Sequence, residues 1–228
     1  MRSFSLFLRA TFVASLMVTA ATRVAVAQSD VTSPADAVVG VQAIAGGDSA
    51  IGMVGTTAAT NNWPGAETPN LAFDNNSANP GATKYLNFAK TGTGVVVTPA
   101  APSIVTGLKL YAANDAPERD PFTYTLEGTN AANPTALGTL WSLISSGDTG
   151  LQTDPGRFVA GPAISFTNVA DYTSYRLLFP TVRDSATANS MQIGEIELLG
   201  SIVPEPATIG LLGSGLLGCG LLRRRRGH

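Results

Sequence analysis

Short runs of alternating apolar and polar residues, separated by clusters of Gly, Pro, Asn and Asp, recur along this chain from Trp63 onward. In one of them Phe122, Tyr124 and Leu126 fall on one parity and polar residues on the other. This period of two is that of a β-strand with one buried face. Between the two ends of the chain, no segment keeps a helical period. The pattern predicts an all-β domain, an antiparallel β-sandwich, with strands at residues 84–88, 94–98, 104–113, 122–129, 140–145, 158–166, 174–180 and 191–199.

Residues 28–62 precede this pattern and are rich in Ala, Gly, Ser and Thr, with one apolar stretch at 37–45. That stretch is either an entry strand or part of a loose linker, and both readings stay open. We therefore expect four parts: a signal peptide at 1–27, an entry segment at 28–62, a sandwich at 63–201 and a sorting tail at 202–228.

The last expected strand changes phase in its middle. Met191 and Ile193 share one parity, whereas Ile196 and Leu198 share the other. A β-bulge at Gly194–Glu195 explains such a slip, and a bulge re-aims a side chain. Glu195 is therefore a candidate ligand, and the alternative is an exposed glutamate on an edge strand.

Charge and rare residues exclude several classes of function. Between residues 28 and 203 there are seven basic and fifteen acidic residues, a net charge of about −8. An acidic body argues against a nucleic-acid partner. The only Cys and the only His, Cys219 and His228, lie in the tail, so the body offers no His base and no Cys or His metal ligand. This excludes the usual Ser-His-Asp and Cys-His hydrolases and zinc enzymes.

The N-terminus has the pattern of a secretory signal peptide. A basic start and an apolar run over residues 10–21 are followed by a small-x-small cleavage site, in which Ala25 and Ala27 precede Gln28. We expect signal peptidase to cut there. The alternative is an amphipathic helix of the fold.

The C-terminus combines a Pro-Glu-Pro motif, a short apolar run and a basic cluster. The motif is Pro204, Glu205 and Pro206, the apolar run spans 207–222, and the cluster is Arg223, Arg224, Arg225 and Arg226. As a helix, the run is ~24 Å long, and it can insert into the membrane if the arginine side chains snorkel. The arginines should hold this end in the cytoplasm. The pattern resembles the PEP-CTERM sorting signal, which implies an exosortase as partner, a transient inner-membrane anchor and an exopolysaccharide-producing host. The alternative is a permanent single-span anchor.

Three motifs in the body resemble the discoidin family, also called coagulation factor five/eight type C, of the galactose-binding-like superfamily. They are Asn-Leu-Ala-Phe-Asp-Asn-Asn at 70–76 leading to Thr83-Lys84-Tyr85, Tyr-Thr-Leu-Glu-Gly-Thr-Asn at 124–130 before Trp141, and Ile-Gly-Glu-Ile-Glu-Leu at 193–198. Tyr85 stands where the family often has Trp. The resemblance implies a galactose-binding-like jelly roll.

The same resemblance implies a structural calcium ion that joins the Asp turn to the closing strand. Its ligands would be Asp74 and Glu195, with Asn76 and Thr83 adding carbonyl or side-chain oxygens. The alternative is that the turn caps itself by hydrogen bonds without a metal.

The densest charge cluster lies in residues 114–121, between two expected strands, where loops of such domains bind. We predict a ligand site there, formed by Asp115, Glu118, Arg119 and Asp120. The alternative is an internally paired loop.

No catalytic site is expected. The sequence thus predicts an exported, non-catalytic surface or matrix module that binds carbohydrate, such as exopolysaccharide; the alternative is a structural envelope or matrix protein without a specific small ligand.

Overall fold

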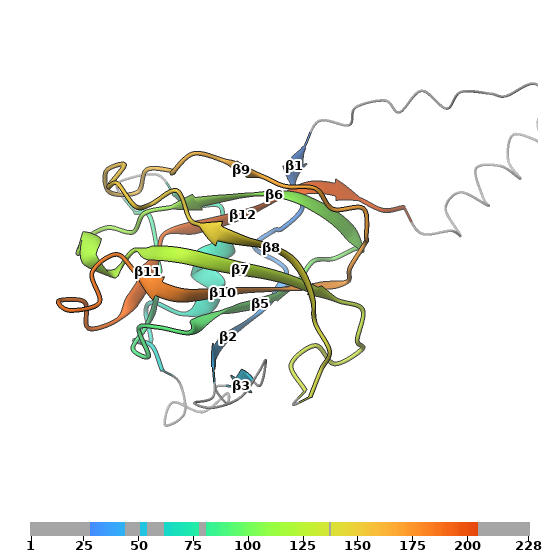
Figure 1. Cartoon of the computed structure of the whole chain (residues 1–228), viewed down its shortest axis with the longest axis horizontal. Helices are drawn as coiled ribbons and strands as arrows, with labels where there is room; N and C mark the ends of the chain where they lie inside the picture. Colours follow the sequence, from blue (N-terminus) through green and yellow to red (C-terminus); the bar gives the residue numbers. More distant parts are fainter. Residues whose placement is uncertain (1–27, 44–50, 54–61, 78–80, 137, 205–228) are drawn as a thin grey trace, which may run out of the picture.

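A computed structural model describes residues 28–43, 51–53, 62–77, 81–136 and 138–204 (Figure 1). The predicted signal peptide, Glu205, Pro206, the apolar run at 207–222 and the arginine cluster lie outside these residues. The described part contains strands and two short 3-10 helices, η1 (Pro69–Phe73) and η2 (Pro117–Arg119). No helix in these ranges is long and apolar enough to cross a membrane.

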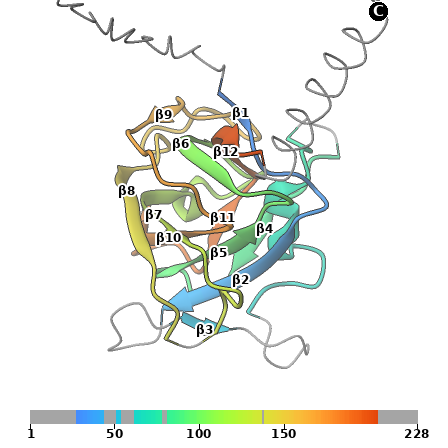
Figure 2. The same cartoon turned by 90° about the vertical axis from the view of Figure 1, so that its right-hand side faces the viewer.

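The strands form two larger sheets and one small one, and every pairing is antiparallel (Figures 1 and 2). The four-stranded sheet has the order β1 (Ser29–Asp30), β12 (Glu195–Ile202), β6 (Ser103–Tyr111) and β9 (Ile164–Ser165). The six-stranded sheet has the order β3 (Ile51–Met53), β2 (Ala37–Ala43), β5 (Thr93–Thr98), β10 (Ser174–Val182), β7 (Pro121–Thr129) and β8 (Ser142–Asp148). The third sheet pairs β11 (Met191–Ile193) with β4 (Tyr85–Asn87).

Alternating side chains from both larger sheets build one hydrophobic core. The core-facing residues of β7 and β10 are buried, as the period of two predicts, and so are those of β6 and β12 on the facing sheet. This arrangement confirms the predicted all-β, antiparallel class. The side chains that meet in the core include Tyr124, Leu126, Tyr175, Leu177, Phe179, Val105, Leu108, Leu110, Ile196 and Leu198.

The structure decides between the two readings left open for one segment and corrects the predicted strand in another. Within the stretch at 37–45, residues 37–43 form the entry strand β2, which pairs with β5 from Ala37–Thr98 to Gln42–Thr93. The sequence predicts one strand at 158–166, but only Ile164–Ser165 forms a strand, β9, and Ala160 adds an isolated bridge to Tyr111. Phe158 has a φ of 59°, in the left-handed region, and Pro162 cannot donate to a ladder, so the run cannot pair along its length.

The phase slip in the last predicted strand marks a change of sheet. Ile193 pairs with Tyr85 in the small sheet, whereas Glu195 pairs with Tyr111 in the four-stranded sheet. At Gly194, between the two pairings, a Cβ atom would lie 2.6 Å from the carbonyl oxygen of Ala112. Only glycine permits this approach, so the chain crosses between sheets here and turns Glu195 inward.

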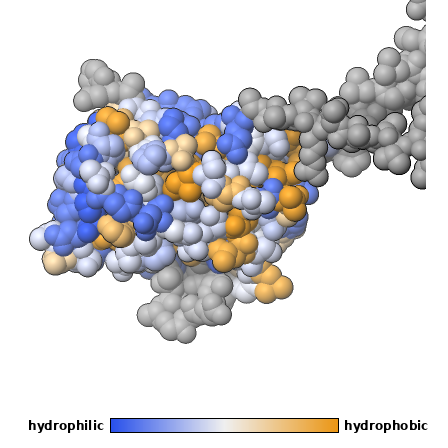
Figure 3. All heavy atoms as spheres, turned by 45° about the horizontal axis from the view of Figure 1, so that its top comes forward, coloured by the Kyte–Doolittle hydropathy of each residue, from blue (hydrophilic) through white to orange (hydrophobic). Residues whose placement is uncertain are grey.

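Strand register sorts the loops to two ends of the sandwich. We call one the charged end: residues 81–84, 88–92, 112–120, 149–159 and 183–190. The other, the tail end, comprises residues 33–36, 99–102, 130–141, 166–173 and 202–204, because β12 finishes there opposite Ser103, which also bridges to Tyr172. The charged end lies at the left of Figure 1 and the tail end at the right. Hydrophilic residues cover most of the left side of Figure 3, and hydrophobic ones are more frequent on the right.

Candidate functional site

The four predicted calcium ligands come together where η1 ends and β12 begins. The backbone N–H of Asn76 donates to Oδ1 of Asp74 at 2.9 Å and to Oε2 of Glu195 at 3.3 Å. The hydroxyl of Thr83 donates to the other oxygen of Asp74. Glu195 is 2% exposed, and its Oε1 is buried with no hydrogen-bond partner in the described part of the chain. Two carboxyl groups distant in sequence, one buried and one half-buried, therefore share one site.

Burial makes the charged form of Glu195 costly. It raises the pKa of this carboxyl to about 8, and the negative charge of Asp74 and a hydrogen bond with it add to the shift. A like-charge pair with an orphaned, buried oxygen needs either a proton or a cation for compensation.

The donor set fits calcium better than a transition metal, because it contains only oxygen. Within the described ranges no three Asp, Glu, His or Cys side chains gather, so an ion here would also need the Thr83 oxygen and backbone carbonyls. The Asp74–Asn76 hydrogen bond is the self-capping turn considered from sequence, but it leaves Oε1 of Glu195 without a partner. Calcium at this site remains a prediction.

The β6–β7 loop is organised around a buried lysine that the sequence did not single out. Lys84 donates to Oδ1 of Asp115 at 2.9 Å and to Oε1 of Gln192 at 3.0 Å, and it lies 3.6 Å from Glu67. Burial alone would raise the pKa of Asp115, but Lys84 holds it below its usual value. Asp115 remains 53% exposed. Its carboxylate is thus ionised and accessible at the rim of the charged end.

Arg119 lies beside Asp115 on the same rim. Its only charged partner among the described residues is Asp115, at 4.0 Å, beyond hydrogen-bond range. Its Nε is buried without a hydrogen-bond partner in that part of the chain. The alternative, in which the charges of this loop pair with one another, therefore applies to Arg119 only through this long contact with Asp115.

Asp120 has a different place from the one predicted. It is fully buried, and both of its oxygens accept hydrogen bonds, from Arg157 at 3.2 and 2.8 Å and from Arg183 at 3.2 Å. Burial raises the pKa of Asp120 despite these two guanidinium groups. Asp120 therefore cannot present its carboxylate to a ligand at the surface; instead it joins three loops. Arg157 also forms an ion pair with Asp154. In the sequence, an acidic residue lies close to each arginine, Asp154 near Arg157 and Asp184 next to Arg183, and this was the available signal that these two loops carry paired charges.

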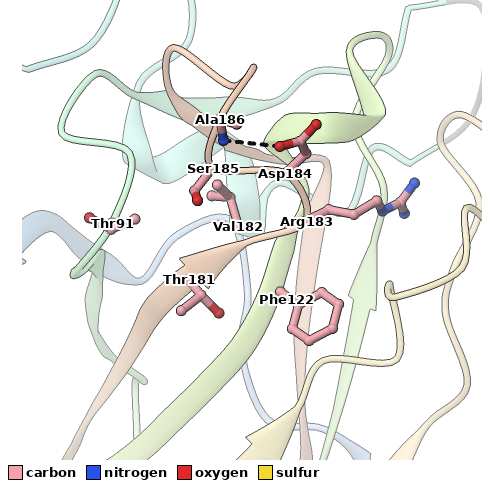
Figure 4. A pocket seen from close by; sticks show the side chains of 8 residues that line it. All are labelled: Thr91, Phe122, Thr181, Val182, Arg183, Asp184, Ser185 and Ala186. Atoms are coloured by element: carbon pink, nitrogen blue, oxygen red, sulfur yellow. Dashed lines mark hydrogen bonds between the residues drawn. The ribbon is translucent and has the colours of Figure 1, made fainter.

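An open hollow of about 450 Å³ lies beside this loop (Figure 4). Thr181 and Phe122 line it from β10 and β7, and in Figure 4 the Phe122 ring and the Arg183 side chain both extend to the right, away from Thr91 and Ser185. Backbone N–H groups of Arg183 and Asp184 donate to the carbonyls of Asp120 and Glu118, at 2.9 and 3.1 Å, so the hollow adjoins the charged loop. The lining residues are Thr91, Phe122, Thr181, Val182, Arg183, Asp184, Ser185 and Ala186.

Comparison with known proteins identifies the tail. Residues 203–226 match the PEP-CTERM protein-sorting motif. The prediction of this motif is confirmed, and it marks the chain for export, transient membrane anchoring and processing by an exosortase. No curated protein matches the chain.

Solved structures similar to this chain include family 32 carbohydrate-binding modules. One is CpGH89CBM32-5 from Clostridium perfringens, in complex with GalNAc-β-1,3-galactose: 10% identity, 76% of this chain and 100% of that chain covered, TM-score 0.49. Another is the family 32 module of Clostridium perfringens NanJ, in complex with galactose: 10% identity, 60% and 88% covered, TM-score 0.44. A third is that of Streptococcus pneumoniae EndoD: 12% identity, 60% and 88% covered, TM-score 0.45.

Proposed function

We propose that this protein is an exported, non-catalytic module that binds carbohydrate through its charged end and acts at the cell surface or in the extracellular matrix. The observation that carries the proposal is the hollow beside the β6–β7 loop. Its volume, about 450 Å³, lies in the usual range for small-ligand sites. Hydroxyl-bearing side chains beside apolar ones suit a sugar, which has apolar C–H faces edged by hydroxyls.

The rim supplies directional groups next to this hollow. Arg119 is the donor, because its guanidinium has no close acceptor among the described residues. Asp115 and Glu118 are the acceptors for sugar hydroxyls, and hydrogen bonds to such charged groups are the stronger ones. Thr91, Thr181 and Ser185 add hydroxyl groups along the hollow.

Calcium has a supporting place in this proposal. An ion held by Asp74 and Glu195 would fix Thr83, whose hydroxyl bonds Asp74. The next residue, Lys84, positions Asp115 of the rim. The ion would therefore stabilise the loop framework and would not itself contact the sugar.

A glycan array probed with the exported, processed protein tests the proposal. We expect saturable binding to at least one glycan, and Arg119→Ala should weaken it by about 10-fold or more, since a hydrogen bond to a charged group contributes ~1.5–3 kcal/mol. The melting temperature should change little, because Arg119 has no close ion-pair partner.

Lys109→Ala is the matched control, since it removes the same charge from the outer face of β6, outside the loops of the charged end. It should leave glycan binding intact. Absence of saturable binding to every glycan would contradict the proposal and favour a structural matrix component. Lower stability with unchanged binding would identify Arg119 as a purely structural residue.

A further inference from the structure

Charged residues are distributed very unevenly between the two ends of the sandwich. The described residues of the tail-end loops contain two carboxylates, Asp36 and Asp171, and no Lys or Arg. Asp36 is occupied by its own turn, since it accepts hydrogen bonds from the backbone N–H and the hydroxyl of Ser33. The loops of the charged end carry ten charged residues: Lys84, Lys90, Asp115, Glu118, Arg119, Asp120, Asp154, Arg157, Arg183 and Asp184.

Large apolar side chains are exposed at the tail end. Leu140 is 88% exposed, Val169 78% and Ile202 59%. Each belongs to a different tail-end segment, and the turns beside them are made of small residues and prolines at 34–35 and 99–102. Isolated exposed apolar residues are ordinary on a protein surface, and Phe88 and Val159 are exposed at the charged end, but the three at the tail end have almost no charge around them.

The sorting tail holds this same end close to the membrane. β12 ends at Ile202, and the apolar run of the tail begins at residue 207 in the sequence. Five residue steps reach at most ~18 Å even when fully extended. A domain of this size is about 40 Å across, from a radius of gyration of about 15 Å. The tether is therefore shorter than the domain, and the tail end is the part of the sandwich nearest the bilayer while the chain is anchored.

We propose that the tail end is a membrane-contacting surface. In the anchored chain, Leu140, Val169 and Ile202 rest in the lipid headgroup region, and the charged end faces away from the bilayer. Desolvation favours this orientation, because charged groups lose hydration at a lipid surface, and the charged end carries ten of them against two at the tail end. The tail end, with the fewest charges, is the end whose approach costs least. The inference rests on the sorting motif and is independent of glycan binding.

Depth-dependent fluorescence quenching tests the orientation. The full-length chain with its tail intact is placed, one copy per disc, in lipid nanodiscs of phosphatidylethanolamine and phosphatidylglycerol. A Cys219→Ser background removes the only native cysteine. An environment-sensitive fluorophore is then attached at Val169→Cys, or at Thr153→Cys as the matched control, an exposed loop residue of the charged end.

Nitroxide-labelled lipids should quench the probe strongly at residue 169 and leave the probe at residue 153 at the level of unlabelled lipids. Adding Ile202→Asp should reduce the quenching at 169, since it places a charge beside the lipid. Equal quenching at both positions, stronger quenching at 153, or no quenching at 169 would overturn the proposal. A probe at 169 that becomes shielded only when discs hold two copies would instead assign this surface to self-association and would also overturn it.

Discussion

Replacing Asp120 with asparagine is expected to lower the free energy of unfolding by about 3–5 kcal/mol, the usual cost of removing one partner from a buried ion pair. The change leaves Arg157 and Arg183 next to each other without the carboxylate that compensates them. At this chain length, the melting temperature should fall by roughly 6–20 °C. The measurement is thermal unfolding of the exported, processed protein followed by circular dichroism.

Asp154→Asn is the matched control for this change. Asp154 pairs with the same guanidinium of Arg157, but its side chain is 37% exposed. Exposed pairs contribute only about 0–1 kcal/mol, so this variant should melt within a few degrees of the wild type. If the two variants cost the same small amount, Asp120 does not hold the loops together.

The second large effect concerns calcium. Calcium at 100 times its dissociation constant should raise the free energy of unfolding by about 2.7 kcal/mol and the melting temperature by several degrees, and chelation should reverse the gain. Zinc should not substitute, because the site offers only oxygen ligands. Thermal melts with millimolar calcium and with chelator measure the effect.

The pH dependence of the calcium-free protein has a definite sign. The pKa of Glu195 is about 8 in the fold, above its ordinary value of 4.5. Between these values the native state holds a proton that the unfolded state has released, so stability falls as the pH rises from about 5 to 8. Calcium displaces that proton, so its stabilising effect should grow over the same range.

Glu195→Gln should abolish both the calcium response and this part of the pH dependence. Glu197→Gln is the matched control: it removes the same charge two residues along the strand, where Glu197 pairs with Lys109 and Tyr111. It should keep the calcium response. Superimposable melts with calcium and with chelator would show that the Asp74 turn binds no ion.

The strands were predictable because each buries one face, which imposes a period of two on the sequence. Tyr175, Leu177 and Phe179 show it in β10. The same principle located Glu195, since its strand changes phase where the chain changes sheet. The prediction of one continuous strand at 158–166 was wrong, because apolar residues in an irregular segment do not indicate how the segment pairs with a neighbouring strand.

The charged loops were harder to predict. The density of charged residues indicated a site at 114–121. A loop has no periodic pattern, however, so its sequence does not indicate which carboxylate is buried and which is exposed. Asp120 is buried because Arg157 and Arg183, from segments far along the chain, converge on it. The hollow likewise depends on how β7 and the β10–β11 loop approach each other, which no local pattern encodes.

Hydrogen exchange measured with and without exopolysaccharide tests most directly whether the charged end is the binding site. The exported, processed protein is used, and exchange is followed peptide by peptide. We predict slower exchange over residues 114–120 and 183–190 at saturating polysaccharide, with no change over 99–102 and 166–173 at the tail end. Protection at the tail end alone, or no protection anywhere at large excess, would contradict carbohydrate binding by these loops.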